Sequence, residues 1–182
     1  MEEAVQFGSR WYGLFLGLLV LARGMDLLST RMATPHLTLE ANPLARKLGW
    51  KWGLPFNLLM CLVFAGWPLP AVIISTTSIL VAARNFQGVW LMRTLGEEAY
   101  RHWMASRVLE TPPVLYVGCL LAQVSLVGLV GGGVVLFGGS WVAMGIGVGI
   151  VAYALAVLIF TLISVWRLRR SQELFPADIL GD

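Results

Sequence analysis

Four long apolar stretches dominate the chain, at residues 11–32, 55–83, 113–137 and 141–166. As α-helices rising about 1.5 Å per residue, all four are long enough to cross a hydrocarbon core of roughly 30 Å. Polar and charged residues gather in the segments between them. The pattern therefore predicts an all-α integral membrane protein.

The second stretch is longer than one crossing requires, and Trp67, Pro68 and Pro70 interrupt its middle. Proline in a helix interior removes a hydrogen bond and kinks or ends the helix. The stretch is therefore either one Pro-kinked helix, giving four spans, or two helices, giving five. A turn at the prolines places nearly every tryptophan at a helix end, where tryptophan meets the membrane interface. This pattern favours two helices.

The basic residues favour the same alternative. Five spans put nearly all of them on one side, with only Arg10 opposite: Arg31, Arg46, Lys47, Lys51, Arg93, Arg101, Arg107, Arg167, Arg169 and Arg170. Basic loops stay cytoplasmic, so the N-terminus is expected outside and the C-terminus in the cytoplasm. We predict one bundle over residues 1–182, with spans at 11–34, 50–67, 70–92, 113–137 and 140–168, in a cell's inner or plasma membrane.

Between the third and fourth spans, residues 93–111 predict a short cytoplasmic helix. Thr94 and Glu97 have the spacing of a capping box, and two glutamates stand four residues before Arg101 and His102. One side of this helix carries Leu95, Ala99, Trp103 and Ser106. Such a helix is expected to lie on the membrane surface or against the bundle.

Composition agrees with the pattern: 58% of the residues are hydrophobic and 13% are charged, with a mean hydropathy of +0.77. Soluble domains carry about 25% charged residues. The net charge of +3 is divided among segments that flank apolar spans, so it indicates membrane orientation and no nucleic-acid partner. Cys61 and Cys119 lie in apolar runs and are expected to be packing residues. The lipid bilayer is the predicted partner.

Small residues recur at helical spacing in several spans. The patterns are Gly128-x-x-x-Gly132, Gly145-x-x-x-Gly149, and a stripe of Gly13, Gly17 and Gly24. Small residues let helix backbones approach closely in lipid. They are expected to make contacts inside the bundle or between protomers, so self-association or assembly with other membrane subunits is predicted.

Ionisable residues inside the spans are the candidate functional residues. Arg23, Asp26 and Thr30 project from one face of the first span, and an unpaired charge at that depth is costly. With five spans, Arg84 and Asn85 reach a similar depth. We predict one polar cluster of these five residues in the cytoplasmic half. Two interpretations stay open: a self-neutralising structural pair, or an intramembrane binding site.

The segment after the first span contains His36, Glu40, Asn42 and Pro43. His36 and Glu40 stand four residues apart, but Pro35 disfavours a continuous helix and no second histidine is near, so no metal is expected. Asn42 is expected to cap the next helix, with Pro43 at its first position. The sequence contains no complete catalytic set and no phosphate-binding loop, so no cofactor is expected and no catalytic residue is assigned.

These motifs carry a resemblance. The Asp-x-x-x-Thr pattern, with a following Glu-x-Asn-Pro, resembles the DUF5658-like family of small bacterial and archaeal membrane proteins of unknown function. The likeness covers the first half of the chain and singles out Asp26, Thr30, Glu40, Asn42 and Pro43. The family tends to carry a lysine in the next helix, where this chain has Asn57. The resemblance implies no activity.

Three functions follow as hypotheses. The leading one is a non-enzymatic, homo-oligomeric or complex-forming subunit with an intramembrane polar binding site. The second is an ion or small-solute transporter or channel that uses Asp26 and Arg84. The third is a membrane-embedded enzyme acting on a lipid or lipid-linked substrate, with Asp26, His36 and Glu40 as acid or base candidates.

Overall fold

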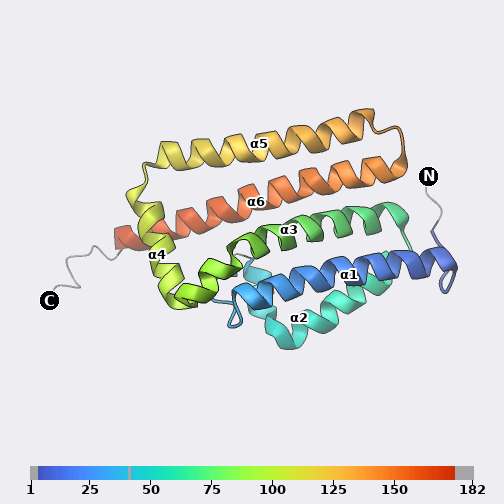
Figure 1. Ribbon diagram of the computed structural model, residues 1–182, viewed down its shortest axis with the longest axis horizontal. Helices are drawn as coiled ribbons and strands as arrows, with labels where there is room; N and C mark the ends of the chain where they lie inside the picture. The colour runs from blue at the N-terminus through green and yellow to red at the C-terminus, as the bar shows by residue number, and fades with distance from the viewer. Residues whose placement is uncertain (1–3, 41, 175–182) are drawn as a thin grey trace.

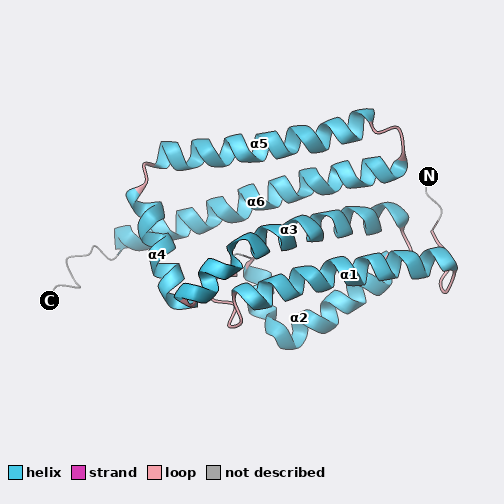
Figure 2. Ribbon diagram, viewed as in Figure 1, coloured by secondary structure: helices cyan, strands magenta, loops and turns pink. Residues whose placement is uncertain are grey.

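The computed structural model describes residues 4–40 and 42–174, and helices joined by short loops make up nearly all of this part of the chain (Figure 2). In chain order the helices are α1 (Arg10–Ala33), α2 (Pro43–Phe64), α3 (Pro68–Leu95), α4 (Glu97–Glu110), α5 (Pro113–Phe137) and α6 (Trp141–Leu174). Four of them, α1, α3, α5 and α6, are long and apolar enough to cross a membrane. The predicted all-helical fold with apolar, membrane-length helices is confirmed.

The second apolar stretch forms two helices. α2 ends at Phe64, and α3 begins at Pro68 after the extended backbone of Trp67 (φ −126°, ψ 106°). Proline suits the first position of a helix because it lacks the N–H that would have no partner there. A continuous Pro-kinked helix over this stretch is therefore not formed, and the turn lies slightly before the predicted one.

α2 begins earlier than the predicted span, at Pro43, and breaks at Gly49 (φ 62°, ψ −172°). The positive φ explains why glycine stands at the break. A further proline, Pro55, lies in its interior. α2 is thus a short segment followed by a longer one, and it is not among the four helices that meet the length and hydropathy of a membrane span.

The contacts fix the directions of the first three helices. Arg23 of α1 contacts Ser78 of α3, and Thr30 contacts Asn85, so α1 and α3 run parallel. α2 runs antiparallel to both, because Tyr12 near the start of α1 donates to the carbonyl of Leu62 near the end of α2. Figure 1 shows this arrangement, with α2 diverging from α1.

Glycines set the packing of α5 and α6. A Cβ on Gly149 of α6 would lie 2.9 Å from the carbonyl oxygen of Ile73 in α3, and one on Gly131 of α5 would lie 2.9 Å from that of Gly147. Of the predicted small-residue patterns, the one at Gly145 and Gly149 therefore makes contacts inside the bundle. The others have no heavy atom within 4 Å of such a Cβ, outside their own helix backbone: Gly13, Gly17, Gly24, Gly128 and Gly132.

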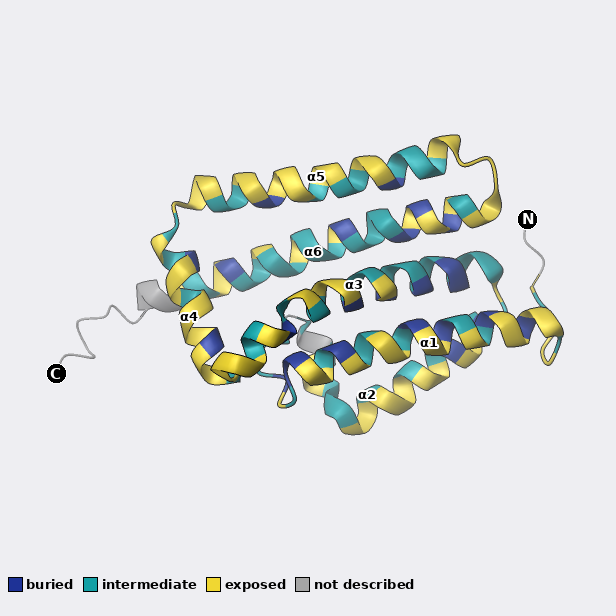
Figure 3. Cartoon of the chain, viewed as in Figure 1, coloured by how far each residue is buried: buried dark blue, intermediate teal, exposed yellow. Residues whose placement is uncertain are grey.

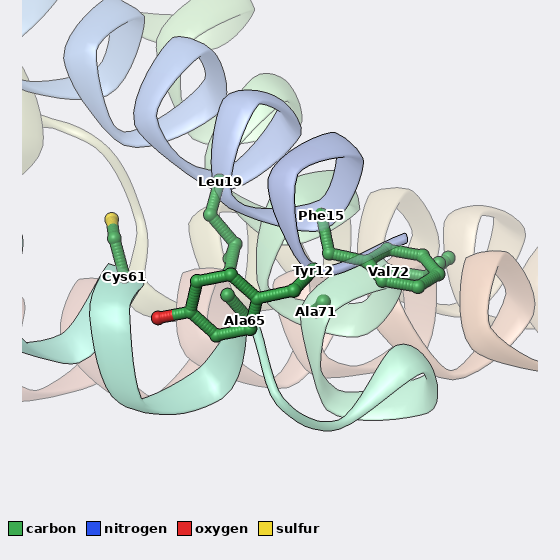
Figure 4. Packing of buried hydrophobic residues seen from close by; sticks show 7 residues of the cluster. All are labelled: Tyr12, Phe15, Leu19, Cys61, Ala65, Ala71 and Val72. Atoms are coloured by element: carbon green, nitrogen blue, oxygen red, sulfur yellow. The ribbon is translucent and has the colours of Figure 1, made fainter. Parts of the chain in front are cut away.

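One hydrophobic cluster joins the start of α1 to the end of α2 and the start of α3 (Figure 4). Its buried members are Tyr12, Phe15, Leu19, Cys61, Ala65, Ala71 and Val72. Cys61 is thus a packing residue, as predicted, whereas Cys119 is exposed on α5. The outer surface of α5 is exposed and apolar, reaching 88% at Phe137 (Figure 3). Such a surface suits hydrocarbon.

α4 crosses one end of the bundle between α3 and α5 (Figure 1), and we call this the α4 end. The end of α6 holds it there: Arg169 Nη2 donates to the carbonyl oxygens of Val108 and Thr111, at 3.2 and 3.1 Å. α4 buries Tyr100 and Val108. The side predicted to be apolar is exposed, at Leu95, Ala99, Trp103 and Ser106, so it does not pack against the bundle, and a position on the membrane surface stays a prediction.

The predicted capping box is wrong. Gly96 (φ 82°) ends α3 and also caps α4, without a side-chain hydrogen bond. Thr94 donates back to the carbonyl of Trp90 instead, because its hydroxyl lies in the last turn of α3. Among the described residues, neither Glu97 nor Glu98 forms an ion pair at i,i+4 spacing.

Candidate functional site: a polar network between α1, α2 and α3

Arg23 is the centre of a polar network inside the bundle. Its Nη1 donates to Asp26 Oδ2 at 2.8 Å and to Ser78 Oγ of α3 at 3.2 Å. Its Nε donates to Asn57 Oδ1 of α2 at 2.8 Å, and Nη2 donates to the same oxygen. One guanidinium therefore links three helices.

The partners satisfy the charges at a depth where unpaired charges are expensive. Removing a charge from water to the centre of a bilayer helix costs at least about 2.5 kcal/mol. Asp26 neutralises Arg23, and Asn57 and Ser78 accept the hydrogen bonds that remain. Asn57 Nδ2 donates to the carbonyl of Gly53 at 2.8 Å, which turns its amide oxygen toward Arg23. The pair is not sealed: 29% of the Arg23 side chain and 14% of that of Asp26 stay exposed.

A second group of contacts continues the network toward the α4 end. Asn85 Nδ2 donates to Ser29 Oγ and to Thr30 Oγ1, both at 3.2 Å. Ser29 Oγ donates to the backbone carbonyl of Asp26 at 2.8 Å. Ser29 is fully buried. The network thus spans about two helical turns of α1, from Arg23 to Thr30.

Four of the five residues predicted to cluster in the membrane come together: Arg23, Asp26, Thr30 and Asn85. Arg84 lies outside the network. The Arg84 residue is exposed, and among the described residues the ion-pair partner of Asp26 is Arg23. Sequence reasoning assigned no role to Asn57, Ser78 and Ser29. The sequence held one signal for these residues: Asn57 is a polar amide within an apolar run.

Residues 34–40 follow α1 in the connection to α2, and we call this segment the strap. Glu40, at its end, is partly buried. Glu40 Oε1 accepts from the Asn42 backbone N–H at 2.8 Å. Asn42 Oδ1 accepts from the Ala45 N–H at 3.5 Å, and α2 begins at Pro43, so the predicted cap is confirmed.

Glu97, at the start of α4, binds the strap with both carboxylate oxygens. Oε2 accepts from Thr34 Oγ1 at 2.7 Å and from Thr38 Oγ1, and Oε1 accepts from the His36 N–H at 3.1 Å. Partial burial alone would raise the pKa of Glu97, but the hydrogen bonds, led by that of Thr38, outweigh it and lower this pKa below its usual value.

His36 is exposed and lies apart from the network. It borders an open hollow of about 480 Å³ between the strap and the junction of α3 and α4, which Arg93 and Glu98 also line. Neither Asp26 nor Glu40 lines this hollow. In this hollow, His36 is therefore not joined by the other two residues considered as acids or bases, Asp26 and Glu40.

No protein-family model, no curated protein and no solved structure matches this chain. The resemblance to the DUF5658-like family therefore stays a prediction.

Proposed function

We propose that this protein crosses the membrane five times and uses the Arg23 and Asp26 network as an intramembrane binding site in its cytoplasmic half. The parallel directions of α1 and α3 support five crossings, since the chain must return across the membrane between them. α2 is the segment that makes this return. Its longer part, after Gly49, covers only about 22 Å at helical rise, so the bilayer thins around it or interfacial side chains reach in.

Charge supports the orientation. The C-terminal part of α6, with Arg167 and Arg169, lies at the α4 end, as do the start of α2 and the end of α3. The basic residues of these segments therefore gather there, while Arg10 begins α1 at the opposite end. By the positive-inside rule the α4 end is cytoplasmic, and the N-terminus lies outside an inner or plasma membrane.

The binding role rests on one observation: the ion pair of Arg23 and Asp26 lies in the bundle and is still partly exposed. A purely structural link could use smaller, neutral groups, which cost less to bury. Ionisable residues inside spans usually mark functional sites. The site would bind a polar or charged group of a ligand or of another subunit.

Glycines with open space beside them support assembly. Gly128 and Gly132 of α5 face open space, as do Gly13 and Gly17 of α1. Close helix contacts in lipid use such positions. A homo-oligomeric or complex-forming subunit is the function that these surfaces and the network together favour.

Native mass spectrometry of the protein released from detergent tests the binding role. We expect a bound mass on the wild type and on Arg84→Gln, since Arg84 lies outside the network. Asp26→Asn should lose that mass while keeping its helix content. Equal occupancy in Asp26→Asn would contradict the proposal, and so would the absence of any bound mass in all three proteins.

The partly exposed carboxylate of Asp26 favours a second candidate, transport of protons or cations. Ionisable residues inside membrane spans are typical of proton and cation pathways. Asp26→Asn in proteoliposomes should then abolish a proton or cation flux that Arg84→Gln retains. The enzyme alternative gains no such support, because His36 lies in the separate hollow.

A further inference from the structure

We propose that the strap is a gate over the cytoplasmic side of the Asp26 site, and that Glu97 of α4 is the latch that holds the gate closed. This inference rests on the proposed binding role of the site. It adds a route of access and a residue that controls it.

The strap turns directly after α1. The Thr34 N–H donates to the Thr30 carbonyl at 2.8 Å, so the strap begins one helical turn beyond the network. The Leu37 N–H then donates to the Thr34 carbonyl at 3.0 Å, and the Glu40 N–H donates to the Leu37 carbonyl at 3.3 Å. These two successive turns keep the strap at the cytoplasmic end of the network.

Leu37 is the residue that the two turns share. Its φ of 58° is in the left-handed region, which is uncommon for a residue with a branched side chain. Its side chain is nevertheless buried. The surrounding contacts thus hold the strap in a conformation that a free segment would rarely adopt.

Most of these contacts come from one carboxylate. Glu97 accepts hydrogen bonds from Thr34, Thr38 and the backbone of His36. Thr34 Oγ1 in turn accepts from the Leu39 N–H at 3.2 Å, which tightens the loop. Because Glu97 belongs to α4, the conformation of the strap depends on the position of a helix outside the α1, α2 and α3 group.

The other side of the strap is held more lightly. Trp50 Nε1, just after the break at Gly49, donates to the Pro35 carbonyl at 2.8 Å. This is a hydrogen bond between neutral groups, and such bonds are roughly half as strong as those to a carboxylate. Loss of the Glu97 contacts would therefore free most of the strap while α2 stays in place.

The test is the accessibility of position 29 from the cytoplasmic side. Ser29→Cys, in a background with Cys61→Ala and Cys119→Ala, places a small thiol beside Asp26 in the fully buried part of the network. Inside-out vesicles are treated with a membrane-impermeant methanethiosulfonate reagent. We expect slow labelling in this parent, because the strap is latched.

Glu97→Ala removes three hydrogen bonds to a carboxylate, so it should raise the labelling rate by more than about tenfold. Glu98→Gln is the matched control: Glu98 is adjacent and exposed, and it should leave the rate unchanged. Thr38→Val removes one donor without touching α4, so it should raise the rate by a smaller factor even if Glu97→Ala fails to fold. Unchanged labelling in Thr38→Val and in any folded Glu97→Ala would overturn the gate, as would an equal rise in Glu98→Gln.

Labelling needs no ligand, so it separates the two proposals. A latch effect on labelling, with no bound mass on any variant, would keep the gate and remove the binding role. Retention of the bound mass together with unchanged labelling would remove the gate alone.

Discussion

Arg23 and Asn57 join two antiparallel helices, α1 and α2, through a 2.8 Å hydrogen bond from the guanidinium Nε to the amide Oδ1. This contact fastens α2 to the rest of the network. Asn57 also bonds within α2, to the carbonyl of Gly53. The amide is therefore held from both sides.

Asn57→Leu should destabilise the protein by about 1–3 kcal/mol, because it leaves donors of a charged guanidinium without an acceptor. Unfolding in mixed micelles with increasing sodium dodecyl sulfate measures the change. Arg84→Gln is the control and should lie within about 0.5 kcal/mol of the wild type, as exposed substitutions usually do. A loss in Asn57→Leu no larger than in the control would show that the amide is not needed by Arg23.

Replacing glycines of α5 and α6 by leucine is expected to have different effects in the two helices. Gly149→Leu should prevent folding, because even its Cβ would meet the Ile73 carbonyl oxygen at 2.9 Å. Gly132→Leu has open space and should fold, yet shift the assembly to a smaller size if α5 is an oligomer surface. Size-exclusion chromatography with light scattering in mild detergent measures both. An unchanged assembly size in Gly132→Leu would exclude this glycine from the interface.

The latch should weaken in acid. The pKa of Glu97 is lowered in the folded protein, so the stability it provides is complete above its usual value of 4.5 and is lost as the pH falls through the lowered pKa. The difference in Tm between the wild type and Glu97→Gln should be constant near neutral pH and shrink below about pH 4.5. A difference in Tm that grows as the pH falls would mean that the pKa of Glu97 is raised, and not lowered, in the folded protein.

The five crossings proposed above would place residues 46 and 69 on opposite sides of the membrane. In the cysteine-free background, Leu69→Cys in the first turn of α3 should react with an impermeant maleimide added to intact cells, and Arg46→Cys should not. Arg46→Cys should react once the cells are opened, which controls for burial of the thiol. Labelling of position 46 but not 69 in intact cells would reverse the orientation and remove the cytoplasmic assignment of the network.

Helix ends that carry strong local signals were predictable. The span predicted at residues 113–137 coincides with α5, since prolines precede it and glycines follow it. α1 begins at Arg10, one residue from the prediction, because Ser9 Oγ accepts from the Tyr12 N–H at 3.2 Å and caps the helix. The start of α2 at Pro43 agrees with the predicted Asn42 cap, whereas the span predicted from residue 50 corresponds only to the part of α2 that follows the break at Gly49.

The network was only partly predictable for a physical reason. Arg23 and Asp26 share a helix, so their spacing alone brings them together. Asn57 and Ser78 come from other helices, and the rotation of each helix about its axis decides whether they face Arg23. Helices in lipid are apolar on nearly all sides, so periodicity gives little information on that rotation. The same uncertainty produced the expectation that Arg84 would face inward.

The Arg169 contacts at the C-terminal end of α4 attach that helix to α6. Glu97, at the other end of α4, binds the strap, so α4 connects α6 to the strap. Thermodynamic linkage requires reciprocity between such attachments. If the Asp26 site binds a ligand and the strap gates it, as proposed, a displacement of the end of α6 changes that affinity, and a ligand at Asp26 favours one position of α6 by the same coupling free energy.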